Sequence, residues 1–173
     1  LETPNISGRM DNLRAAILRP QLRLLDDRVR RWRVLYDTLE AGLADVPGLA
    51  CVPRPAHEDF VGSSFQFLLP GWDGARVTAF VAGCAARGVE LKWFGAADPV
   101  AFTSRYSHWA YAEPPSLPQT DRVLAGLIDL RLPLTFTPAD AALIARIIAA
   151  EAAAQARTPT PQTPEDRPRS PSS

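Results

Sequence analysis

The stretch "NISGRMDNLRAAI", residues 5–17, places a polar, glycine-containing turn directly before an apolar helix. Asn5 and Ser7 belong to the residue types that form turns and cap helices, whereas Met10, Leu13 and Ile17 recur at helical spacing. A turn at this place needs a preceding chain to turn from. The sequence therefore predicts either a trimmed module or the second half of a larger protein.

A long helix is expected from Arg9 to about Val46, with a kink near Pro20 because proline has no N–H to donate inside a helix. After the proline, apolar residues recur at alternating spacings of three and four. A helix with this pattern could belong to a short coiled coil, but the pattern favours a long helix lying along a domain surface. This helix seam consists of Leu22, Leu25, Val29, Trp32, Tyr36, Leu39 and Leu43.

Beyond this helix, strands and helices alternate. Strands are expected at 49–53, 63–69, 89–94 and 128–134, and helices at 74–88, at 120–127 and from the N-cap Thr137 onward. The pattern predicts an α+β fold, a sheet of about four strands with helices on one side. We expect three parts: a turn and connecting helix (1–47), a small α+β domain (48–156) and a disordered, proline-rich tail (157–173).

Composition excludes several classes of protein. The 173 residues carry no net charge, so we expect neither nucleic-acid nor membrane binding. A cytoplasmic location is the default expectation. The spacing of Cys51 and Cys84 is not that of metal ligands, so both are expected to be free thiols and no metal site is predicted. "RVRRWR" (28–33) resembles a basic patch, but neighbouring aspartates indicate a solvated helix face.

No self-sufficient active site is visible. The chain contains no glycine-rich phosphate loop, no nucleophile elbow and no zinc motif. His57 and His108 lie far apart in expected loops and are interpreted as solvated. Lys92, the only lysine, lies in an expected strand.

The segment "SGRMDNLRAAILRPQL" (7–22) resembles the one that follows the cofactor lysine in the DegT/DnrJ/EryC1/StrS family of sugar aminotransferases. "RGVELKWF" (87–94) and "DLRLPLTFTPADAALIARII" (129–148) are similar to later segments of that family, in the same order. The resemblance covers about residues 5 to 150. It implies fold type I, which binds pyridoxal 5′-phosphate (PLP).

In that family the large domain comes first and carries the lysine that forms the Schiff base. The resemblance therefore implies that the catalytic lysine lies upstream of Leu1 and that this chain alone is inactive. It also implies a homodimer in which the turn before the Arg-Met pair reaches the partner's cofactor phosphate. Arg9 matches the family, while Asn5 or Ser7 takes the place of its asparagine; helix capping is the alternative role for these two residues.

The loop from Gly95 to Pro118, called here the aromatic loop, is long and contains an arginine. Trp93 just before it, with Arg105, Tyr106 and Trp109 within it, could stack on a base or sugar and pair with a diphosphate. The His-x-x-Pro-Tyr stretch common in the family is missing, so ordinary loop packing remains open.

The sequence thus favours part of a PLP-dependent aminotransferase that acts on a keto-sugar nucleotide, with glutamate as amino donor. A related enzyme that uses PLP for dehydration remains open. The alternative from another class is a stand-alone α+β interaction module that dimerises through the Leu22–Leu43 helix seam. Nucleic-acid binding ranks last.

Overall fold

The computed structural model describes residues 10–99, 105–109 and 113–157. Within these ranges the elements follow the order α1 (Asn12–Leu22), α2 (Leu25–Leu43), β1 (Ala50–Cys51), β2 (Ser64–Leu68), α3 (Gly74–Ala86), β3 (Lys92–Trp93), η1 (Tyr106–His108), α4 (Pro118–Gly126), β4 (Leu127–Arg131) and α5 (Pro138–Arg157). The α+β fold expected from the sequence is confirmed.

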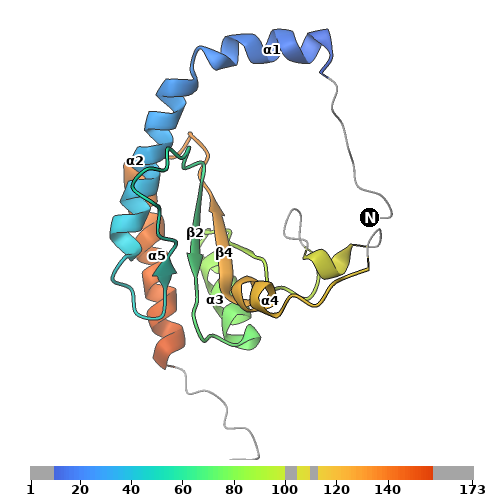
Figure 1. Cartoon of the computed structure of the whole chain (residues 1–173). Coiled ribbons are helices and arrows are strands. Elements are labelled where there is room, and N and C mark those ends of the chain that lie inside the picture. Colours follow the sequence, from blue (N-terminus) through green and yellow to red (C-terminus); the bar gives the residue numbers. More distant parts are fainter. Residues whose placement is uncertain (1–9, 100–104, 110–112, 158–173) are drawn as a thin grey trace, which may run out of the picture.

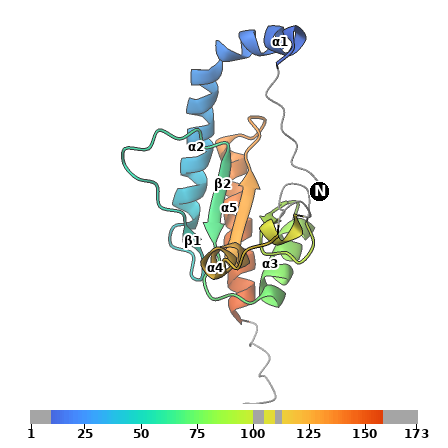
Figure 2. The same ribbon diagram turned by 45° about the vertical axis from the view of Figure 1, so that its right-hand side comes forward.

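The four strands form one antiparallel sheet in the order β1-β2-β4-β3. Strand β2 buries alternate side chains, Phe65 and Phe67, and β4 buries Ile128 and Leu130 opposite them. Successive side chains of a strand point to opposite faces, so these four residues share the face that the helices cover. Figures 1 and 2 show α2 and α5 running alongside the sheet on that side.

The core lies between this face and the inner sides of α2, α3 and α5. Tyr36 and Leu39 of α2 are fully buried, as are Phe80 of α3 and Ile148 of α5. The start of α5 agrees with the sequence, because the Thr137 backbone N–H donates to Asp140 and the Asp140 N–H donates to the Thr137 hydroxyl. The expected N-cap is therefore confirmed.

The long N-terminal helix is interrupted, as the sequence indicated. The interruption lies at Arg23 and Leu24, three residues beyond Pro20, and Pro20 itself lies inside α1. Figure 1 shows α1 turning away from α2 and extending beyond the body of the domain. None of the α1 side chains is buried.

The outer strands are shorter than expected. β1 covers two residues of the expected 49–53, and β3 covers two of the expected 89–94. Pro53 soon follows β1, and proline cannot donate to a strand ladder. No helix within the described ranges combines the length and apolar character that a membrane crossing requires.

Candidate functional site

Two of the residues predicted to bind substrate meet at one carboxylate. Arg105 donates from Nη2 to Oδ1 of Asp121 at 2.8 Å, and the Tyr106 hydroxyl donates to Oδ2 of Asp121 at 2.8 Å. Asp121 lies in the first turn of α4, which begins at Pro118 as is common for helix starts. The aromatic loop is therefore tied to α4 by a charge-assisted pair.

The shared carboxylate sets the charge state of this cluster. The hydrogen bond from Tyr106, and then that from Arg105, lowers the pKa of Asp121, while the bond to Asp121 raises the pKa of Tyr106. At neutral pH the cluster therefore contains an ionised carboxylate, a guanidinium and a neutral phenol. Among the described residues, the buried Nε of Arg105 has no hydrogen-bond partner.

His108 is anchored rather than solvated, which corrects the expectation from the sequence. Its Nδ1 accepts the Arg105 backbone N–H at 3.1 Å, and its Nε2 lies 2.9 Å from the carbonyl oxygen of Ala97. Because a carbonyl can only accept, the proton belongs on Nε2. Sequence alone does not indicate this, because one of the two bonds joins His108 to a carbonyl eleven residues earlier in the chain.

Trp93 is held at the other end of α4. Its indole N–H donates to the carbonyl of Ala125 at 2.8 Å. A Cβ on Gly95 would lie 2.5 Å from the Trp93 Nε1, so the glycine makes room for the ring. Trp109 is 38% exposed. The structure thus brings Arg105 and Tyr106 together at Asp121, and the Trp109 backbone N–H donates to the carbonyl oxygen of Tyr106 at 3.2 Å.

The residues predicted to contact the cofactor phosphate, Asn5, Ser7 and Arg9, lie outside the described residues. Lys92 stands opposite Asp129 in the register of β3 and β4. This lysine lies on a short edge strand, after and not before the Arg-Met pair. The described ranges therefore show no site for PLP, and they contain no grouping of acidic, histidine or cysteine side chains that could hold a metal.

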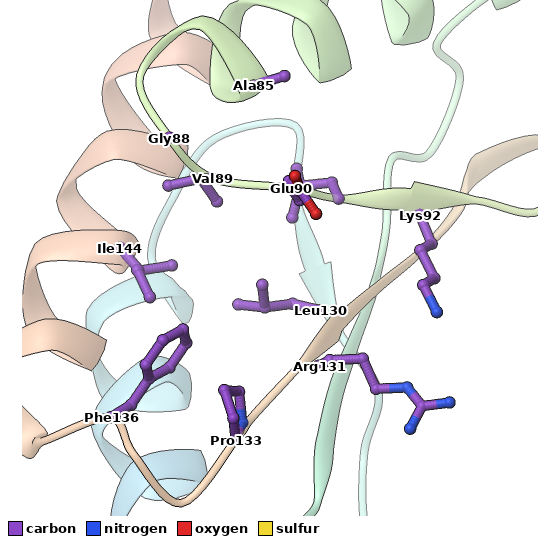
Figure 3. Close-up of a pocket in the computed structure, with 11 residues that line it drawn as sticks. Ala85, Gly88, Val89, Glu90, Lys92, Leu130, Arg131, Pro133, Phe136 and Ile144 are labelled. Atoms are coloured by element: carbon purple, nitrogen blue, oxygen red, sulfur yellow. The ribbon is translucent and has the colours of Figure 1, made fainter. Parts of the chain in front are cut away.

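A cleft of about 700 Å³ opens where β3 stops pairing with β4. Figure 3 shows its two sides, an apolar wall with Phe136 and Ile144 and a polar side with Lys92 and Arg131. Glu90 lies between Val89 and Lys92 along the chain and also lines the cleft. The cleft is thus amphipathic, with charges of both signs.

Sequence reasoning missed two residues of these sites. Asp121 follows Pro118 by three residues, so its place in the first turn of a helix could have been predicted. Its two hydrogen-bond partners could not, because they come from the aromatic loop. Arg131 alternates with the buried residues Leu130 and Leu132, so its exposure could have been expected. Its nearness to Lys92 depends on strand register, which a single sequence does not give.

Comparison with known proteins gives a consistent picture. Residues 2–149 match the profile of the DegT/DnrJ/EryC1/StrS aminotransferase family. A comparison with curated proteins finds no match.

Several solved structures share the fold of this chain. The aminotransferase TlmJ from Streptoalloteichus hindustanus is 25% identical, with a TM-score of 0.69 over 82% of this chain and 36% of its own. DesI, solved with its TDP-sugar product, is 18% identical, with a TM-score of 0.64 over 83% of this chain and 36% of its own.

A putative sugar aminotransferase from Streptococcus pneumoniae, solved in its PMP form, is 10% identical, with a TM-score of 0.63 over 84% of this chain and 36% of its own. The chain therefore spans little more than a third of the length of each of these enzymes.

Proposed function

The chain belongs to the DegT/DnrJ/EryC1/StrS aminotransferase family, and from this premise we propose that it supplies the small domain of a PLP-dependent sugar aminotransferase. The observation that carries the proposal is a single family match running from residue 2 to residue 149. The α+β fold, shared with part of TlmJ at a TM-score of 0.69, supports it.

In this proposal the intact enzyme passes an amino group from glutamate to a keto-sugar nucleotide. Its Schiff-base lysine lies upstream of Leu1, because Lys92 is the only lysine of the chain and follows the Arg-Met pair. Arg9, with Asn5 or Ser7, contacts the cofactor phosphate of the partner in a homodimer. Residues 1–47 connect the two domains, 48–156 form the small domain, and 157–173 form the tail.

The aromatic loop is proposed to close over the sugar nucleotide. Trp109 offers an exposed ring for stacking, and Trp93 stands at the start of the loop. Arg105 and Tyr106 are already held by Asp121. In this proposal Arg105 presents the remaining N–H groups of its guanidinium to the substrate, and Asp121 positions both side chains.

The interaction-module alternative has less support from the structure. Tyr36, Leu39 and Leu43 of the helix seam are fully buried in the chain's own core. A dimer through the seam would have only its N-terminal end, including Leu22 and Leu25, to use. The observations thus favour the enzyme.

The test is an amino-transfer assay on the native gene product loaded with PLP. Glutamate and a TDP-4-keto-6-deoxy sugar are supplied together, and formation of 2-oxoglutarate and of the amino sugar is followed. We expect both products in equal amounts. Loss of water from the sugar without consumption of glutamate would identify a dehydratase, and absence of both reactions across a panel of keto-sugar nucleotides would contradict the proposal.

A further inference from the structure

A second hollow lies beside the cleft of Figure 3 and is named here the Lys92–Arg131 hollow. Its volume is about 570 Å³, and it shares Lys92, Arg131 and Pro133 with the cleft. Its lining consists of Trp32, Ser63, Lys92, Arg131, Leu132 and Pro133. No acidic side chain belongs to that lining, and its two charged side chains, Lys92 and Arg131, are both positive.

The sheet places the two cations on the same face. Lys92 of β3 stands opposite Asp129 of β4, and Arg131 follows Asp129 by two residues. Side chains two apart on a strand share a face, so both cations lie opposite the helix-covered side. Figure 3 shows both side chains extending away from Phe136 and Ile144.

Two acids of the described ranges lie near the cations: Asp129 stands opposite Lys92 in the sheet, and Glu90 lines the larger cleft together with Lys92 and Arg131. Asp129 is 7% exposed and accepts a hydrogen bond from Gln66 at 3.4 Å. Glu90 lines the larger cleft and not the hollow. Lys92 and Arg131 also interact with other groups of the chain, and a ligand would add to those interactions or replace them.

The wall of the hollow is fixed before any ligand arrives. The Trp32 indole N–H donates to the carbonyl of Leu132 at 2.8 Å, and Arg31 donates to the carbonyl of Leu134 at 2.8 Å. These bonds tie α2 to the segment that follows β4. The Trp32 ring and Pro133 therefore lose little conformational entropy when a ligand binds, which favours binding.

We propose that the Lys92–Arg131 hollow binds a small organic anion, a carboxylate or a phosphate ester with a flat apolar body. The guanidinium of Arg131 and the ammonium of Lys92 take the anionic group, and the Ser63 hydroxyl supplies a neutral donor. Trp32 and Pro133 contact the apolar body. None of the lining residues belongs to the described part of the aromatic loop, and the proposal stands or falls independently of the aminotransferase activity.

The single lysine makes the test specific. Reductive methylation of the full chain with ¹³C-formaldehyde keeps the positive charge and yields one side-chain NMR signal, that of Lys92, with the α-amino group as internal reference. Phenyl phosphate and benzoate are titrated at constant ionic strength, and benzyl alcohol serves as the uncharged probe. We expect the Lys92 signal to shift saturably with at least one of the two anions and to ignore the alcohol.

Arg131→Gln should weaken that binding about tenfold, as expected for the loss of a charge-assisted hydrogen bond. Arg146→Gln, which removes an exposed arginine of α5, is the matched control and should leave the binding unchanged.

Tighter binding of phenyl phosphate would identify a phosphate ligand, and tighter binding of benzoate would identify a carboxylate ligand. A Lys92 signal that never saturates, or equal affinities in the two variants, would overturn the proposal; if Arg131→Gln does not fold, the titration of the unaltered chain decides alone.

Discussion

Asp121 ties two described residues of the aromatic loop to α4. Its two carboxylate oxygens each accept one hydrogen bond from consecutive loop residues, Arg105 and Tyr106. The lowered pKa of Asp121 means that the carboxylate contributes stability above the pKa it has in the unfolded chain. That contribution is lost as the pH falls through the lower, folded-state pKa.

Replacing Asp121 should change the ionisation of Tyr106. The hydrogen bond to the Asp121 carboxylate is the largest cause of the raised Tyr106 pKa, and in Asp121→Asn that carboxylate and its charge are gone, so this pKa should fall toward the ordinary value for tyrosine. The measurement is an alkaline titration of tyrosinate absorbance, with Tyr106→Phe in each background to isolate this residue. An unchanged midpoint would show that Asp121 does not hold the Tyr106 hydroxyl.

The two cysteines should differ in reactivity. Burial raises the pKa of Cys84 to about 12, and Cys84 is fully buried, whereas Cys51 is only half-buried. A disulfide reagent at pH 8 should therefore modify one thiol per native chain, and Cys51→Ser should abolish this reaction. Rapid labelling that persists in Cys51→Ser would contradict the burial of Cys84.

At the scale of elements, α2 and α5 form the closest helix pair of the domain. Gly42 of α2 lies so near α5 that an added Cβ would be 2.7 Å from the Cβ of Ala145. Real side chains do not approach so closely, so this glycine allows the two helices to pack. Their contact places Leu39 and Leu43 in the core.

Gly42→Ala should therefore destabilise the domain by about 1–3 kcal/mol through overpacking, although alanine favours a helix. The double variant Gly42→Ala with Ala145→Gly removes the clash and should recover part of that loss. Denaturant unfolding of the two single variants and the double variant measures the coupling. Strictly additive effects would show that the two helices do not meet at this pair.

Much of this element pattern could be predicted from sequence. The Thr137 cap, the alternation of Phe65 and Phe67 and the helix seam all depend on local spacing, which a sequence contains. The lengths of β1 and β3 could not be predicted. An edge strand is as long as its pairing with the neighbouring strand, and that pairing is a non-local property. The Asp121 cluster and the pair of Lys92 with Arg131 depend on register and loop path, which are non-local.

At the scale of the whole molecule, α1 is a helix that contributes no buried side chain to the core of the domain. Its side chains include Leu13, 71% exposed, and Leu22, 68% exposed. Figures 1 and 2 both show α1 extending beyond the rest of the domain. An apolar helix of this kind is expected to pack against another domain, which agrees with a chain that spans 36% of TlmJ.

The 173-residue chain should therefore bind a hydrophobic dye through α1. Leu13→Gln combined with Leu22→Gln should reduce dye fluorescence and self-association while leaving the melting temperature unchanged, because neither side chain is packed. Leu143→Gln, which alters a 47% exposed leucine of α5, is the matched control and should have little effect on the dye. Equal losses of dye binding in both variants would show that α1 is not the exposed surface.

The central claim, that this chain completes a PLP enzyme whose lysine lies elsewhere, is tested most directly by locating the cofactor's attachment. The native gene product is reduced with borohydride, which fixes PLP to its lysine, and is then mapped by peptide mass spectrometry. The account predicts one pyridoxyl-lysine, in a peptide upstream of Leu1. A pyridoxyl group on Lys92, or none anywhere in the protein, would contradict it.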